Sequence, residues 1–402
     1  MRPAPILTPH IGAGDGDLRR GLLIAKLIYF SFFAAIGCLV PFLNIYFARR
    51  GLSGAEIGWL GSLPPLVALA ANPVWGAVAD RWHIHRIVLA VCAFGAGMVS
   101  LLLLGAGSFW SLMAVVVLLS FFRTPIGSLL DSAVLDMVRQ IGAHYGRQRM
   151  WGGLGFVLVT LGLGQVISPD SLQVAFWLHA LLMGVVVAGL GLRLPIARRE
   201  GQAPIWDGLR QLAGQRPYIA FLGAMALLGI GNSCYVNFIG LHMLNLGGDE
   251  RMVGLAWSAN AFAEMPMMLL GGRWFARFGY GWLIQVGFTG YFVVWLLLAM
   301  VGAPWQIVIV TYLVGSCYGT LWVAAVNFAG QSAPPGLSAT AQALVGAANA
   351  GVGWGIGSVV AGYLWDAQGG PAVFTAAAVA ALLGGLLFTW GNRTEPVPAS
   401  VS

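Results

Sequence analysis

Residues 22–47 read LLIAKLIYFSFFAAIGCLVPFLNIYF, and Lys26 is the one charged side chain in this run of 26 residues. An α-helix rises about 1.5 Å per residue, so roughly 20 apolar residues cross a hydrocarbon layer about 30 Å thick. The run is therefore predicted to be a helix that spans a membrane. It is too long for the core of a signal peptide, so we expect this span to remain in place.

The composition of the whole chain agrees with this reading. Of the 402 residues, 58% are hydrophobic and 9% are charged, which excludes a water-soluble domain. The formal net charge is +7, but the basic residues are spread through short connectors rather than gathered on one face, so no nucleic-acid partner is expected. The sequence contains no nucleophile–base pair and no metal cluster, so we expect neither an enzyme nor a bound metal or cofactor.

Eleven further apolar runs follow the first one, separated by charged residues or by glycine and proline. Each is long enough to cross a bilayer, so the sequence predicts twelve transmembrane helices. The predicted spans are 22–47, 57–78, 87–106, 111–135, 151–167, 174–192, 218–244, 253–272, 282–301, 305–328, 339–364 and 372–390.

The longest polar connector divides these spans six plus six. We expect an N-terminal tail at 1–20, a six-helix bundle at 21–192, a linker at 193–217, a second bundle at 218–390 and a tail at 391–402. Two halves of similar length are typical of an internal repeat, and carriers built in this way bind their substrate between the halves near mid-membrane.

The arginines predict the orientation of the chain. If both termini are cytoplasmic, the outer connectors contain only Arg49, Arg50 and Arg251, and the other connector arginines face the cytoplasm. This bias follows the positive-inside rule. We therefore expect a multi-pass protein of the inner (cytoplasmic) membrane with both termini in the cytoplasm.

The connector after the second span contains a possible gate. Residues 76–86 read GAVADRWHIHR, in which Gly76 permits a close helix approach, Asp80 can cap a helix or pair with arginine, and Arg81 and Arg86 can bind the negative end of a helix. The segment resembles the loop signature of the major facilitator superfamily. The resemblance implies an all-α membrane protein with twelve transmembrane helices in two pseudo-symmetric six-helix bundles. The alternative is an ordinary charged turn.

A second segment resembles one branch of that superfamily. Residues 145–156 read YGRQRMWGGLGF and are similar to the fifth helix of the lactose permease and phenylpropionate permease branch. In that branch an arginine at the place of Arg149 acts with an acid eighteen residues earlier, which here is Asp131. The pair is expected either to hold substrate or to be a static bridge between helices. The glycine-rich eleventh span and the acid at Glu264 also resemble this branch.

Three ionisable side chains lie deep within predicted spans, where each costs roughly 2.5–3.5 kcal/mol on insertion scales. Glu264 is a candidate for proton coupling, or it hydrogen-bonds between helices as a structural contact. Arg123 lies eight residues before Asp131, where it binds an anionic group of a substrate or pairs with Asp131 or Glu264. Asp131 is the third of these residues.

The sequence also departs from lactose permease. Residues 310–328 of the tenth span include no histidine, lysine or acid, whereas lactose permease has its proton-coupling residues there, so lactose is not an expected substrate. The seventh span has Asn232 and Tyr235 in place of aspartates, and these two residues are further candidates for substrate contact.

We expect a secondary active transporter, a monomer in the bilayer, that takes up a small organic solute with protons by alternating access. The expected solute is an aromatic carboxylate or a saccharide-like molecule. One alternative is a proton-driven drug or metabolite exporter, although the fifth span lacks the proline of the usual antiporter motif. Another is a non-transporting assembly factor or sensor on the same fold.

Overall fold

The protein is described by a computed structural model that covers residues 15–195, 212, 214–333 and 337–392. Within these ranges all regular elements are helical, and no strand occurs. The elements are α1 (Asp15–Leu39), α2 (Leu43–Arg49), α3 (Gly54–Trp82), α4 (His85–Gly105), α5 (Phe109–Ile141), α6 (Tyr145–Val166), α7 (Gln173–Ala180), η1 (Leu181–Val187), α8 (Ala188–Gly191), α10 (Arg216–Asn245), α11 (Glu250–Phe278), α12 (Tyr280–Met300), α13 (Pro304–Ser332), α14 (Ser338–Gly346), η2 (Ala347–Gly353), α15 (Trp354–Gln368) and α16 (Gly370–Asn392).

Each of the twelve predicted spans coincides with helical backbone, which confirms the all-α fold class. Among the described residues, ten helical stretches are long and apolar enough to cross a membrane. The other two, α6 and α11, contain more polar residues, among them Arg147 and Arg149 in α6 and Glu250 and Glu264 in α11. The tails and most of the linker predicted at 193–217 lie outside the described residues.

The structure differs from the prediction in three spans. The first is interrupted between α1 and α2, where Pro41 lacks the N–H group that a continuous helix needs. The sixth and eleventh spans each contain one stretch of π-helix, η1 and η2. Wider π turns of this kind are common at functional sites in helices.

The helices form two compact units. The first contains Met1–Cys38, Val67–Val159 and Gln173–Gly201, and the second contains Leu39–Leu66, Thr160–Leu172 and Gln202–Ser402. Helices α3 and α6 therefore contribute residues to both units. The division of the sequence into six-helix halves at 21–192 and 218–390 stays a prediction.

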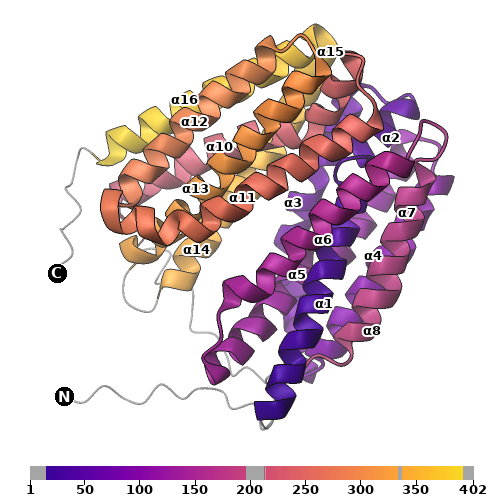
Figure 1. Ribbon diagram of the computed structural model, residues 1–402, viewed down its shortest axis with the longest axis vertical. Helices are drawn as coiled ribbons and strands as arrows, with labels where there is room; N and C mark the ends of the chain where they lie inside the picture. Colours follow the sequence, from indigo (N-terminus) through magenta and orange to yellow (C-terminus); the bar gives the residue numbers. More distant parts are fainter. Residues whose placement is uncertain (1–14, 196–211, 213, 334–336, 393–402) are drawn as a thin grey trace. The chain divides into compact units, whose positions relative to one another are not determined.

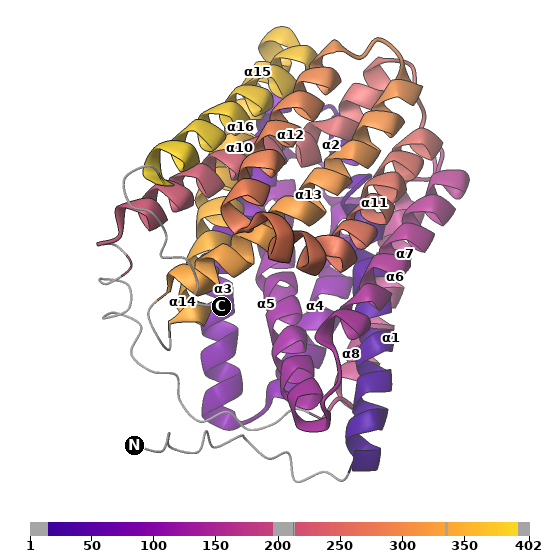
Figure 2. The same cartoon turned by 60° about the vertical axis from the view of Figure 1, so that its left-hand side comes forward.

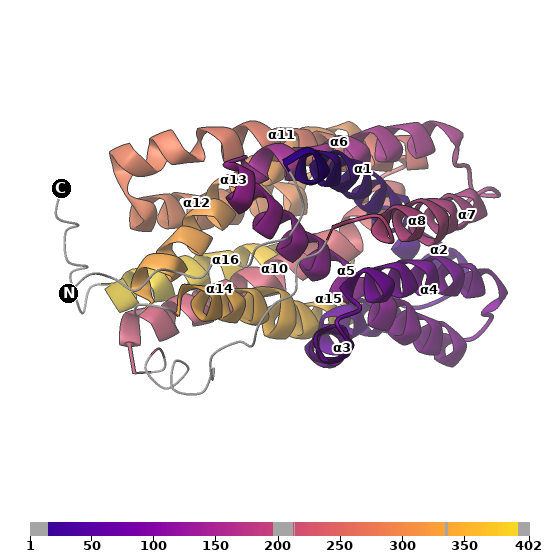
Figure 3. The ribbon, with the colours of Figure 1, turned by 90° about the horizontal axis from the view of Figure 1, so that it is seen from below.

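In the first unit, α4 packs against α5, α7, η1 and α8 (Figures 1 and 3). The contact with η1 depends on a small residue, because a side chain at Gly97 would come within 2.6 Å of the backbone nitrogen of Gly184. Helix α1 lies along α6, where the backbone of Gly155 touches the carbonyl of Phe30. The second of these approaches brings α1 and α6 within side-chain reach of each other.

In the second unit, α10 packs against α16, η2 and α15 (Figure 2). Two of the glycines from the eleventh predicted span make this contact possible. A side chain at Gly353 or Gly357 would collide with the backbone of α10, whereas no described atom lies within 4 Å of the Cβ position of Gly351. Helix α11 packs along α13, where Gly315 faces the backbone of Asn260.

Candidate functional site

The main polar cluster of the first unit surrounds Asp131 on α5. Its carboxylate accepts a hydrogen bond from the Tyr29 hydroxyl of α1 at 2.5 Å. Arg149 of α6 donates through Nη1 to both carboxylate oxygens, at 3.1 and 3.2 Å, and to the Tyr145 hydroxyl at 3.2 Å. The Arg149 guanidinium also lies 5.4 Å from the centre of the Phe33 ring. Three helices therefore meet at one ion pair.

The local sequence explains why these groups meet. Helix α5 ends at Ile141 and is capped by Gly142, whose φ of 64° is left-handed, and α6 begins at Tyr145. Arg149 follows Tyr145 by four residues, which places both side chains on one face of α6. A side chain at Gly152 would collide with the Phe33 ring, so this glycine lets α1 approach α6 closely.

The ion pair is accessible and only partly satisfied. The side chains of Arg149 and Asp131 are 45% and 32% exposed. In the part of the chain that the structure describes, Arg149 donates through Nη1 alone, so Nη2 and Nε remain available to another acceptor. A ligand with hydroxyl or carboxylate oxygens could accept from these donors while Asp131 holds the guanidinium in place.

Arg123 lies on the same helix, two turns from Asp131, and is half-buried. The structure does not pair these two residues, because Asp131 is bound to Arg149. Within the described ranges Arg123 makes no hydrogen bond and no ion pair. The charged group thus has no carboxylate beside it.

The candidate residues of the second unit lie on α10 and α11. Tyr235 is buried on α10, and its hydroxyl accepts from Asn260 Nδ2 at 3.3 Å. Asn232 is buried about one turn earlier on the same helix. Glu264 is half-buried on α11, at a point where a side chain on Gly319 of α13 would come within 2.8 Å of its carbonyl oxygen. Glu264 therefore lies in the close contact between these two helices, one turn from the tighter approach of Gly315 to Asn260.

The predicted gating turn has a different hydrogen-bond pattern from the one expected. Asp80 Oδ1 lies 2.9 Å from His85 Nε2, so its partner here is a histidine rather than an arginine or a helix N-terminus. Arg81 and Arg86 are exposed and form no ion pair with any described residue. No described atom lies within 4 Å of the Cβ position of Gly76, so the close helix contact expected there is not formed among the described residues.

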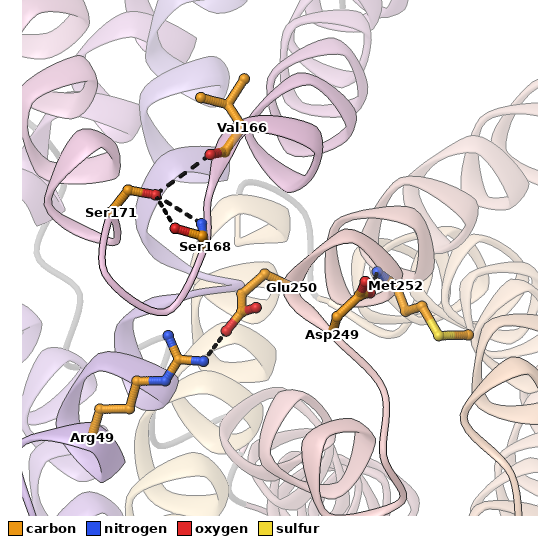
Figure 4. Close-up of polar contacts among 7 residues, drawn as sticks. All are labelled: Arg49, Val166, Ser168, Ser171, Asp249, Glu250 and Met252. Atoms are coloured by element: carbon orange, nitrogen blue, oxygen red, sulfur yellow. Dashed lines mark hydrogen bonds and ion pairs between the residues drawn. The ribbon is translucent and has the colours of Figure 1, made fainter.

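A further ion pair, in the second unit, joins the end of α2 to the start of α11 (Figure 4). Arg49 Nη2 binds Glu250 Oε1, and the two side chains are 30% and 5% exposed. Asp249 caps α11 by accepting from the Met252 backbone nitrogen at 2.9 Å. Arg49 and Glu250 lie 201 residues apart in sequence, and their pairing was not predicted.

Comparison with known proteins adds the family to this geometry. The model of the MFS_1 like family matches residues 22–376, which is most of the chain. The protein belongs to this family. It is therefore a transporter of the major facilitator superfamily and not an enzyme, as the sequence predicted.

Two relatives and one solved structure show which known transporters this MFS_1-like protein resembles. It is 33% identical to the maltose permease of Geobacillus stearothermophilus over 85% of this chain and 87% of that one. It is 26% identical to the probable 3-phenylpropionic acid transporter of Escherichia coli K12 over 70% and 75%. The nucleoside transporter NupG has the same fold, with a TM-score of 0.80 at 19% identity over 93% of this chain and 100% of that one.

Sequence reasoning missed several residues of the Asp131 cluster of this MFS_1-like transporter. Tyr29 and Phe33 lie in an apolar run where nothing in the spacing distinguishes them from ordinary span residues. Tyr145 could have been found, because it precedes Arg149 by one helical turn. His179 was not predicted as a site residue, although its imidazole interacts electrostatically with Arg123.

Proposed function

We propose that this protein takes up a small saccharide-like solute together with protons by alternating access. The observation that carries the proposal is the half-exposed Asp131–Arg149 pair, which Tyr29 and Tyr145 surround in one compact unit. Such a pair offers both a carboxylate and free guanidinium donors to a ligand that has several hydroxyl groups. Nearby Phe33 adds an apolar ring face.

The relatives support a saccharide over an aromatic carboxylate. The named substrate of the relative at 33% identity is maltose, and the identity to the probable 3-phenylpropionic acid transporter is lower and covers less of the chain. The carboxylate of Asp131 also disfavours an anionic group at the same place, because like charges repel there. An aromatic carboxylate as the substrate is one possible result of the uptake experiment described below.

In this proposal Glu264 carries the coupled proton. It is an acid within a predicted span, and intramembrane acids of carriers are common proton sites. Its half-buried position on α11 gives a proton access without full exposure to water. Asn232 and Tyr235 would supply polar substrate contacts from α10. Alternating access would move residues 21–192 against 218–390.

The orientation and the gate are part of the same proposal. Both termini would lie in the cytoplasm, with a monomer in the inner membrane. The turn at Gly76, Asp80, Arg81 and Arg86 would then be cytoplasmic, and its partners would change as that side opens and closes. The contact between Asp80 and His85 would belong to one of these conformations.

Uptake into proteoliposomes tests this proposal. The purified protein is reconstituted, an inward-directed pH gradient is imposed, and accumulation of labelled maltose and of 3-phenylpropionate is measured in parallel. We expect maltose to accumulate with the gradient and to equilibrate without accumulation when the gradient is abolished. Accumulation of 3-phenylpropionate alone would make the substrate an aromatic carboxylate in place of a saccharide. Loss of either solute from loaded vesicles while an inward proton gradient is imposed would favour a proton-driven exporter. No transport of any solute would favour a sensor.

A further inference from the structure

A second polar position lies in the first unit, at Arg123 of α5 and His179 of α7. The His179 side chain is 0% exposed, and its Nδ1 lies 2.8 Å from the carbonyl oxygen of Ala35 on α1. The other ring nitrogen, Nε2, is buried and has no hydrogen-bond partner among the described residues. The Arg123 charge is close enough to act on this imidazole electrostatically. Both residues lie near the level of Ala35 on α1, because His179 binds its carbonyl oxygen and Arg123 lies one turn of α5 from Gly127, which faces Phe32 of α1.

The tautomer of His179 follows from its partner. A carbonyl oxygen can only accept, so Nδ1 carries the hydrogen that it donates to Ala35. In the neutral ring Nε2 is then an acceptor with a free lone pair. Leaving such a group buried without a partner costs roughly 1–3 kcal/mol, so its presence needs an explanation. A ligand that donates a hydrogen bond would satisfy it.

Arg123 presents the complementary problem. A guanidinium has five N–H donors and no acceptor, and within the described ranges no acid lies beside this one. On the same turn of α5, Thr124 Oγ1 is also buried without a partner in the described part of the chain. Arg123 and its neighbour Thr124 therefore both carry polar groups without a partner among the described residues, on one turn of α5.

The position has a defined distance from the Asp131 cluster. Helices α1 and α5 run side by side, with Tyr29 bonded to Asp131 and the Phe32 ring 3.9 Å from the Cβ position of Gly127. The next turn of α5 in this direction reaches Arg123, and the next turn of α1 reaches Ala35. Eight residues separate Arg123 from Asp131, which is about 12 Å along a helix. On α1 the six residues from Tyr29 to Ala35 amount to about 9 Å.

We propose that Arg123 and His179 form a second binding position that takes one hydroxyl group of the substrate, about 10 Å from the Asp131 cluster. A hydroxyl group is the ligand that fits both partners, because its oxygen accepts from Arg123 while its hydrogen is donated to His179 Nε2. A carboxylate could satisfy only the arginine. The inference rests on the proposed function and narrows it to an elongated solute with hydroxyl groups at both ends, such as a two-ring saccharide.

The two partners are reached in order. His179 Nε2 is sealed from solvent in this conformation, whereas Arg123 is half-buried. A substrate hydroxyl therefore meets Arg123 first, and it reaches His179 when the long arginine side chain turns with it. This order places the second position among the contacts that form as the substrate becomes enclosed.

Calorimetric binding to the purified full-length protein in lipid nanodiscs tests the inference. Arg123→Gln removes the charge, and His179→Asn keeps a donor for Ala35 while removing the Nε2 acceptor. The matched controls are Arg139→Gln, an exposed arginine on the same helix, and His242→Asn, a buried histidine whose ring nitrogen likewise contacts a backbone carbonyl. The probes are maltose, glucose and 3-phenylpropionate.

We expect Arg123→Gln and His179→Asn each to weaken maltose binding by at least about tenfold, and the controls to change it by less than about twofold. Glucose, with one ring, reaches one position only, so its weaker binding should change by less than about twofold in both variants. A maltose analogue that lacks the bound hydroxyl should lose affinity for the wild-type protein but not for Arg123→Gln. This comparison needs no variant of His179, so it holds if that variant does not fold.

Three results would overturn the inference. Unchanged maltose binding in Arg123→Gln, with a lower melting temperature, would make the pair a structural contact. A loss of 3-phenylpropionate binding with maltose unaffected would make Arg123 an anion site. Wild-type protein that binds none of the three probes would remove the inference and the substrate class together. The proposed function itself fails separately, if Asp131→Asn binds maltose as tightly as the wild-type protein does.

Discussion

At the scale of single residues, Asp131 is central to the proposed binding of substrate. Its carboxylate is the shared acceptor of Tyr29 and Arg149, and it fixes the guanidinium that a ligand would meet. The pair is half-exposed, so its contribution to folding is at most about 1 kcal/mol. A group that contributes little to stability and joins three helices is well suited to binding and release.

Asp131→Asn tests this role. The variant keeps the shape of the side chain but removes its charge, so Arg149 loses its fixed position. We expect uptake to fall by at least about tenfold while the melting temperature in detergent stays within a few degrees of the wild type. Asp170→Asn, at an exposed aspartate, is the control and should transport normally. Full uptake by Asp131→Asn would remove the cluster from the binding site.

The second ion pair makes a different contribution, because Glu250 is almost fully buried and Arg49 is partly buried. Breaking such a contact leaves an uncompensated charge, so the two single variants Arg49→Gln and Glu250→Gln should each lower stability. The double variant should lose less than the sum of the two, with a coupling of about 1 kcal/mol or more. Thermal unfolding in detergent measures this.

The control cycle for this pair combines Glu250→Gln with Arg251→Gln. Arg251 is exposed on the next residue of α11, so its effect should add to that of Glu250→Gln within about 0.5 kcal/mol. If the effects of Arg49→Gln and Glu250→Gln are also additive, the contact between α2 and α11 contributes nothing to the free energy of unfolding.

At the scale of helices, glycines decide where α10 and the η2–α15 segment touch. Gly353 faces the carbonyl of Ala226, and Gly357 faces the backbone of Ile230. Gly351 lies in the same π turn with nothing within 4 Å of its Cβ position. Some glycines of this stretch therefore form the contact face with α10, and others, such as Gly351, lie between them without such a contact.

Gly353→Ala and Gly351→Ala form a matched pair. The first should destabilise the protein by about 1–3 kcal/mol, because the new methyl group forces the two backbones apart. The second adds the same methyl group in open space and should be neutral or slightly stabilising. Melting temperatures of the two variants compare them directly. Equal melting temperatures would contradict the assigned contact.

The sequence predicted these helices well because a membrane span has a strong local signal, a long apolar run. It predicted the Asp131–Arg149 pair because the spacing of these residues resembles a known branch. Tyr29 lies 102 positions from Asp131, and no local pattern connects residues that meet only through helix packing. The π turns were not predictable either, since Gly353 and its neighbours read as ordinary helix.

At the scale of the whole molecule, the family match covers residues 22–376 and makes the chain a transporter. Coupling to protons is the central claim of the proposed function, and it depends on one acid in the second unit. Glu264→Gln keeps the size and hydrogen-bonding ability of the side chain but cannot take up a proton at neutral pH. We expect this variant to bind maltose and to exchange it between vesicle interior and medium, while it no longer accumulates maltose with a pH gradient.

The most direct measurement is the external pH of a lightly buffered proteoliposome suspension when maltose is added without an imposed proton gradient. Potassium and valinomycin hold the membrane potential at zero. Proton-coupled uptake predicts that the medium becomes more alkaline as protons enter with maltose, that Glu264→Gln abolishes this change, and that protein-free vesicles show none. Entry of labelled maltose with no change in external pH, or with acidification, would contradict it.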